Sequence, residues 1–144
     1  MAGSSHHTNS EDVKRMILLR LKKLKESAST PHPWSKPGTP ENARAYVDKL
    51  ITNDITKAIT ACDPFDDVKI LQALEDISTQ LEKLVSKLAS EEFTSVRKYI
   101  FERKHDIGYC KEHVHLYMIF KNEENSHTPH TSLRSLLVRL HSDI

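Results

Sequence analysis

Apolar residues recur at alternating intervals of four and three between positions 70 and 88, and this repeat limits the possible folds more than any other feature. On a helix, such spacing places all of its members on one face, which must be covered. Leu71 and Val85 make the apolar face wider than the seam of a coiled coil. The run is also shorter than the three to four heptads, roughly, that are typical of a coiled coil. The pattern therefore favours a bundle formed within one chain, with a homodimer as the alternative. The repeat consists of Ile70, Leu74, Ile77, Leu81, Leu84 and Leu88.

Other parts of the chain combine helical spacing with residues that typically begin helices. The expected N-caps are Ser10, Thr39, Asp63 and Ser90, and proline follows two of them at the first helical position. The helices predicted from these starts cover residues 11–27, 40–62, 64–88 and 91–108. The fold class we expect is all-α, a compact bundle of about four to five helices with a basic N-terminal helix joined by a proline-rich linker.

The C-terminal part of the sequence is less regular. We expect Phe101 to face inward and Gly108 to end its helix in the left-handed conformation. Residues 114–120 have the β-branched and aromatic content of a strand, but no partner strand is evident, so a helix is predicted there too. Residues 121–129 are expected to form a polar loop. A last helix, capped by Thr131 or Ser132, should then follow with its leucines inward.

Length and composition narrow the class of protein. The chain has 144 residues, which suits one domain, and only 3 glycines, which excludes glycine-rich loops of the kind that hold nucleotides. No apolar run is long enough to span a bilayer, and neither a secretory signal nor a clear disulfide pattern is present. We therefore expect an intracellular protein, cytoplasmic or nuclear.

Proline marks the division of the chain. Residues 28–40 contain four prolines, which interrupt both helix and sheet, so this segment is predicted to be a linker. We expect a disordered lead over 1–10, a basic amphipathic helix over 11–27 and a bundle domain over 41–144. Trp34 is the only large apolar side chain of the linker. It either packs on the domain, which we favour, or is exposed as a recognition residue.

The helix predicted over 11–27 is the strongest candidate for a binding element. Its apolar residues can dock on the bundle and leave the cations in solvent, or the helix can bind a partner groove, phosphates or an anionic membrane. Nucleic acid is the weaker option, because phosphate neutralisation needs a wider basic surface and residues 41–90 carry more acids than bases. The candidate binding cations are Lys14, Arg15, Arg20, Lys22, Lys23 and Lys25.

Cysteine and histidine offer the only alternative chemistry. The pairs Cys110–His113 and His127–His130 resemble zinc-ligand spacing, and Cys110 with His113 is the only candidate for thiol catalysis. A compact zinc site usually contains more cysteines, and no oxyanion loop accompanies the thiol. We therefore treat these four residues as weak metal candidates and expect no cofactor.

The segments ILQALEDIST (70–79) and VRK (96–98) resemble the small helical bundles at the N-termini of transcription elongation factors. The tryptophan typical of those domains has no counterpart here. Lacking catalytic motifs, the sequence predicts a non-enzymatic adaptor or regulatory domain that binds another protein. The expected contacts are the basic helix, Trp34, or an inter-helix groove beside Leu81 and Leu84; nucleic-acid or membrane binding through residues 14–25 is the second hypothesis and a metal or thiol enzyme the third.

Overall fold

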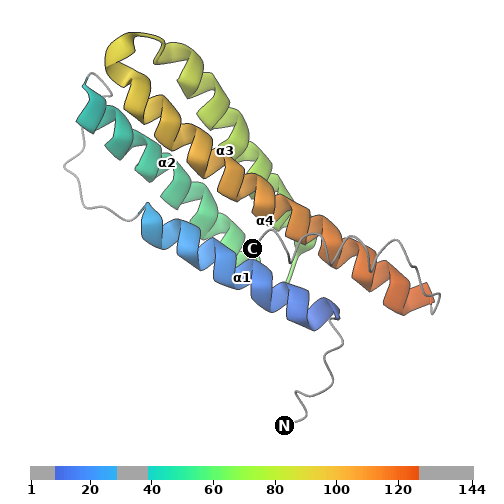
Figure 1. Cartoon of the computed structure of the whole chain (residues 1–144). Helices are drawn as coiled ribbons and strands as arrows, with labels where there is room; N and C mark the ends of the chain where they lie inside the picture. Colours follow the sequence, from blue (N-terminus) through green and yellow to red (C-terminus); the bar gives the residue numbers. More distant parts are fainter. Residues whose placement is uncertain (1–8, 29–38, 127–144) are drawn as a thin grey trace.

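The structure, a computed structural model, is an all-α bundle and describes residues 9–28 and 39–126 (Figure 1). Three predicted segments lie outside the described residues. They are the lead up to residue 8, the linker residues 29–38 with Trp34, and the last helix with His127 and His130. The described residues form four α-helices: α1 (Ser10–Ser27), α2 (Pro40–Thr60), α3 (Asp67–Lys87) and α4 (Thr94–Ser126). A short 3₁₀ helix, η2 (Glu91–Phe93), precedes α4.

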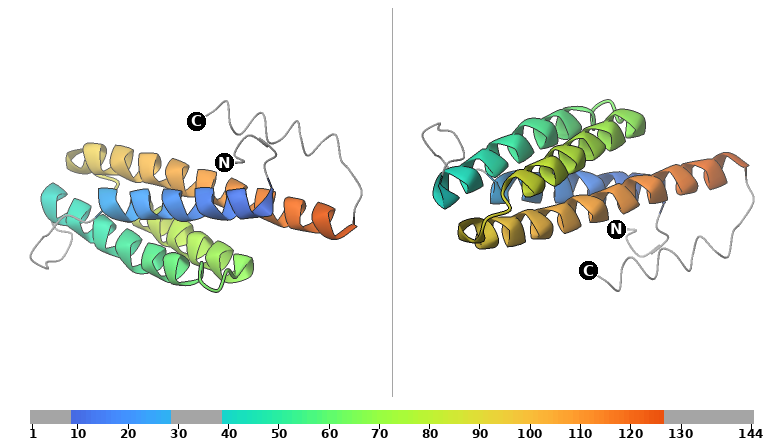
Figure 2. Two further views of the ribbon diagram at one scale, coloured as in Figure 1. Left: turned by 90° about the horizontal axis from the view of Figure 1, so that it is seen from below. Right: turned by 90° about the horizontal axis from the view of Figure 1, so that it is seen from above.

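The apolar repeat of α3 is covered by the chain's own helices, as predicted. Four of its members, Ile70, Leu74, Ile77 and Leu81, are fully buried, and Leu84 and Leu88 are 7 % and 4 % exposed. Helix α3 packs against α2 on one side and α4 on the other, and α1 packs between α4 and α2 (Figure 2). The basic helix is therefore one of the four helices of the bundle and not an appendage to it.

The helix starts follow local capping chemistry, with two differences from prediction. Thr39 caps α2 as expected. Asn9, not Ser10, caps α1, because its side chain accepts from the Asp12 N–H while the Asp12 carboxylate accepts from the Asn9 N–H. Helix α3 starts at Asp67 with Asp66 as its cap, and not at Asp63, since Asp63 and Pro64 belong to the turn that connects α2 with α3.

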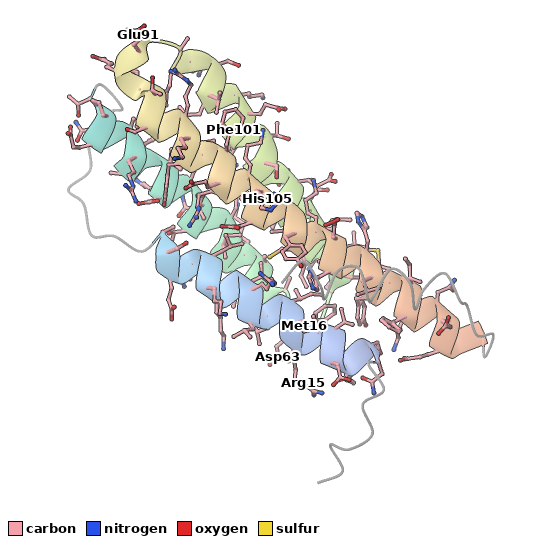
Figure 3. The ribbon with its side chains drawn as sticks, in the orientation of Figure 1. Arg15, Met16, Asp63, Glu91, Phe101 and His105 are labelled. Atoms are coloured by element: carbon pink, nitrogen blue, oxygen red, sulfur yellow. The ribbon has the colours of Figure 1, made fainter. Side chains whose placement is uncertain are left out.

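Helix α4 corrects several predictions for the C-terminal part. It continues through Gly108, which has no left-handed conformation, and through residues 114–120, which are helical as predicted. It also occupies 121–126, where a loop was expected. Phe101 is 57 % exposed rather than inward, and Figure 3 shows it on the outer side of α4 with His105. One continuous stripe through Ile100, Ile107 and Val114 buries apolar side chains along the whole helix.

Polar contacts fix the direction of the helices relative to one another. The Glu124 carboxylate, near the end of α4, accepts from Ser10 N at 3.0 Å and from Ser10 Oγ at 2.9 Å, at the start of α1. Arg103, in the first third of α4, reaches Ser27 at the end of α1. The two helices are therefore antiparallel, and a carboxylate lies at the positive end of the α1 dipole.

Candidate functional site: the outer face of α1 and its junction with α4

The apolar face of α1 is buried in the core. Val13, Ile17 and Leu21 are fully buried, and Leu24 is 5 % exposed. The apolar residues of this helix dock on the bundle, as one interpretation predicted, and Lys22 and Lys23 are exposed to solvent. Because its apolar face holds the bundle together, α1 presents its cations from a fixed position.

The first cations of α1 are partly neutralised by acids of the same helix. Lys14 Nζ lies 3.0 Å from Glu11 Oε2, and Arg15 pairs with Asp12. The hydrogen bond to Glu11 raises the pKa of Lys14, although partial burial opposes this. Lys14 also lies 5.3 Å from the centre of the Phe65 ring, which contributes a cation–π contact to the α2–α3 turn. This half of α1 is therefore close to electrically balanced.

The second half of α1 keeps its positive charge. Lys22 and Lys23 are exposed, and within residues 9–28 and 39–126 neither has an ion pair. The Arg20 guanidinium lies 4.5 Å from the centre of the Tyr109 ring on α4, which holds it at the junction of the two helices. Lys25 is half-buried and has contacts of its own. The uncompensated charge of α1 thus lies toward its C-terminal end.

An apolar side chain lies among these cations. Leu19 is 55 % exposed, and Arg15, Lys22 and Lys23 are its neighbours on the helix at spacings of three and four. Figure 3 shows Arg15 directed away from the bundle near the start of α1. We call Arg15, Leu19, Lys22 and Lys23 the Leu19 patch. It combines positive charge with an exposed apolar side chain.

A second cluster ties α2 to α4 beside the junction. The carboxylate of Asp48, which is 3 % exposed, accepts a hydrogen bond from the Tyr99 hydroxyl. The guanidinium carbons of Arg44 and Arg103 lie 4.3 Å and 5.2 Å from the centre of the Tyr99 ring. Burial, with a smaller effect of the bond to Asp48, raises the pKa of Tyr99 to about 12. Tyr99 is therefore a neutral donor that holds a buried carboxylate and supports two cations.

Arg103 connects this cluster to α1. Its Nη1 donates to Ser27 Oγ at 3.1 Å, and its Nη2 lies 3.2 Å from Asp106 Oδ2. Three groups thus orient the guanidinium, namely a hydroxyl of α1, a carboxylate of α4 and the Tyr99 ring. Arginine held in this way keeps a fixed donor geometry, which a lysine could not provide.

The cysteine and histidine candidates lie inside α4. Cys110 is fully buried, and burial raises the pKa of its thiol to about 12, so it stays protonated and is a poor nucleophile near neutral pH. His113 is also buried, with Nδ1 2.9 Å from the Tyr109 carbonyl oxygen. Among the described residues, no group of three or more His, Cys, Asp or Glu side chains is placed to hold a metal ion. His127 and His130 lie outside those residues.

Leu81 and Leu84, beside which a partner groove was predicted, are buried. Both side chains are core residues of α3, so in this packing they offer no surface to a partner. A cavity of about 480 Å³ does occur elsewhere, between the end of α2, the following turn and the start of α3. Ala61, Pro64 and Ala73 line it together with charged residues of both signs. Its charges nearly balance, with Lys57 and Lys69 against Asp63, Asp66 and Asp76.

Sequence reasoning found the cations of α1 but missed the residues that organise them. Leu19 could have been found, because it lies outside the buried stripe of α1. The bond between Tyr99 and Asp48 joins residues 51 positions apart, and no local pattern announces it. The same holds for Arg103 and Ser27, which are 76 positions apart.

Comparison of the chain with protein-family models, with curated proteins and with solved structures gave no match in any of the three. Among the helices of the described residues, none is both long enough and apolar enough to cross a membrane.

Proposed function

We propose that this bundle is a non-enzymatic interaction domain that binds another protein through the Leu19 patch. The partner would contribute an acidic segment carrying at least one apolar side chain. The observation that carries the proposal is the 55 % exposure of Leu19 between cations, on a helix that buries Val13, Ile17, Leu21 and Leu24 and leaves Met16 and Leu18 only partly exposed. Burying such a leucine at an interface is favourable, whereas leaving it in water gives the free protein nothing.

The composition of the patch favours a protein over the other polyanions. A nucleic-acid backbone offers phosphates but no apolar surface for Leu19, and high affinity for it requires many phosphate contacts. An anionic membrane would accept Leu19, but stable adsorption requires a broad apolar face, and that face of α1 is in the core. An acidic peptide with apolar residues at helical spacing matches both the charge and the single apolar centre.

The test is a comparison of the binding of five fluorescent probes at two salt concentrations. The probes are an acidic peptide with leucine and phenylalanine at helical spacing, the same peptide with serine in place of both, a single-stranded RNA, and vesicles with and without phosphatidylserine. We expect the acidic apolar peptide to bind most tightly. Its affinity should fall with salt, because part of the attraction is between charges.

Two variants and one control separate the contributions. Leu19→Ser should weaken binding of the acidic apolar peptide by about fivefold or more, since about half of a leucine's burial is lost. The double variant Lys22→Glu/Lys23→Glu should abolish it. The matched control is Val68→Ser, which removes an apolar side chain that is 65 % exposed on α3 and should change nothing. Equal binding of both peptides, an unaffected Leu19→Ser protein, or stronger binding of RNA or phosphatidylserine vesicles would each refute the proposal.

A further inference from the structure

A small cavity of about 260 Å³ lies between the C-terminal half of α1 and the middle of α4. It is separate from the α2–α3 cavity and is open to solvent through exposed residues of α1. Such a volume is below the usual range for drug-sized ligands and suits a single small group. Its polar lining consists of Arg20, Lys23, Ser27, Arg103, Asp106 and Cys110.

The lining is positively charged. Three of these side chains are cations, and the one carboxylate, Asp106, already pairs with Arg103. The remaining polar groups are the hydroxyl of Ser27 and the thiol of Cys110, which is neutral because burial raises its pKa to about 12. A small anion entering the cavity would therefore meet excess positive charge contributed by two helices, and no second carboxylate of the lining would repel it.

The cations are held in place before any ligand arrives. Arg20 is stacked on Tyr109, and Arg103 is fixed by Ser27, Asp106 and the Tyr99 ring. Fixed donors lose little conformational freedom when they bind, which favours recognition of a small group.

Arg103 has donors left for a ligand, because Nη1 and Nη2 each carry two hydrogens and only one of each is directed at Ser27 and Asp106. Its Nε is fully enclosed, and no residue of the described part of the chain accepts a hydrogen bond from it. Because Nε is enclosed, a ligand in the solvent-open cavity would meet the Nη groups of Arg103 and not Nε. Arginine recognises phosphate by donating through several nitrogens of one guanidinium to several oxygens.

We propose that this cavity is a binding site for a tetrahedral oxyanion, either inorganic phosphate or the phosphate of a small phosphomonoester. Arg103 donates to it from the α4 side, Arg20 neutralises it from the α1 side, and Lys23 closes the solvent side. No covalent step is involved. The site does not depend on the function proposed for the Leu19 patch, because its specific residues are Arg103 and Arg20 and only Lys23 is common to both.

The experiment is a titration of the folded chain with inorganic phosphate, followed by two-dimensional NMR, against sodium chloride at matched ionic strength. We expect saturable shifts confined to amides around residues 20–27 and 103–110 with phosphate and none with chloride. Glycerol 3-phosphate and methyl phosphate in separate titrations distinguish a phosphomonoester ligand from the free ion. Tighter binding of either ester than of inorganic phosphate would identify the ester as the ligand class.

Three variants assign the binding. Arg103→Gln should raise the dissociation constant for phosphate about tenfold or more, since a charge-assisted hydrogen bond is lost. Lys23→Gln, which removes an exposed side chain that has no ion pair among the described residues, should raise it about threefold and keeps the test valid if Arg103→Gln does not fold. Lys22→Gln removes the same charge from the neighbouring position outside the cavity and should have no effect. Absence of saturable phosphate shifts, or wild-type affinity in Lys23→Gln, would overturn the proposal, while loss of peptide binding in Leu19→Ser has no bearing on it.

Discussion

The buried pair of Asp48 and Tyr99 gives the sharpest prediction about what stabilises this bundle. Asp48 is 3 % exposed, and the hydroxyl of Tyr99 donates to its carboxylate across the α2–α4 interface. In Tyr99→Phe the ring remains to pack and to support its two arginines, but the carboxylate loses a donor. A hydrogen bond to a charged buried group is worth about 1.5–3 kcal/mol, and we expect a loss of about 2 kcal/mol.

The same structure predicts how this loss should depend on the charge of Asp48. In Asp48→Asn the side chain still accepts from Tyr99 but is neutral, so the cost should be about 1 kcal/mol or less. In the double variant, removing the tyrosine hydroxyl no longer deprives a buried charge of its donor. The two changes should therefore be less than additive, with a coupling of about 1 kcal/mol between them.

The assay is urea unfolding of the four proteins, followed by circular dichroism at one temperature and pH. A loss of about 2 kcal/mol would also lower the melting temperature by roughly 5–10 °C in a chain of this size. A cost below about 0.5 kcal/mol for Tyr99→Phe, or strict additivity in the double variant, would show that the carboxylate does not depend on this hydroxyl. The argument that Tyr99 organises the junction would then fail.

Four further predictions concern pH, thiols and packing. Folding raises the pKa of Tyr99 from its ordinary value to about 12, so the folded state holds this proton more tightly than the unfolded state. The stability that this provides below about pH 10 should therefore be lost as the pH rises toward 12. Melting curves should show a smaller loss in Tyr99→Phe. Cys62, which is half-buried, should react with iodoacetamide about tenfold faster than the fully buried Cys110, as measured by mass spectrometry of modified peptides, and equal rates would mean that α4 opens readily. Leu81→Ala should lower the free energy of unfolding in urea by about 2–5 kcal/mol, because it removes a fully buried side chain. Lys83→Ala, on the exposed side of the same helix, should lower it by less than about 0.5 kcal/mol. Similar losses in the two variants would refute the assignment of the α3 repeat to the core. Gly108→Ala should stabilise the protein by about 0.5–1 kcal/mol in the same assay, because an added Cβ meets no atom within 4 Å; destabilisation would place a helix end there.

Much of the fold could be predicted because the buried residues of each helix recur at helical spacing within a short stretch of sequence. The repeat of α3 and the stripe of α1 name the residues that are buried, and Thr39 with Pro40 marks the start of α2. Periodicity fixes a face of a helix without reference to the rest of the chain. The prediction of a helical bundle, which rested on periodicity alone, is confirmed by the structure.

The prediction that Gly108 ends a helix is wrong because the low helix propensity of glycine is outweighed by packing on both sides of it. Glycine inside a helix costs about 1 kcal/mol relative to alanine, which is enough to suggest an end but not to enforce one. Continuing the helix buries Ile107 and Val114 completely, and each contributes about 1.5–3 kcal/mol. The packing energy on both sides of the glycine exceeds its cost, so the helix continues.

The sequence could identify the cations of the candidate site but not their arrangement, because that arrangement depends on contacts between helices. The six cations of α1 form one basic segment in the sequence, yet the structure divides them. Acids one turn away compensate Lys14 and Arg15, while Arg20 lies against α4, where it joins Arg103 around the small cavity. A count of charges along the chain assigns equal weight to all six. Acids of α1 itself leave the uncompensated charge in its second half, and the antiparallel packing of α1 on α4 adds Arg103 there, where we expect an anion to bind.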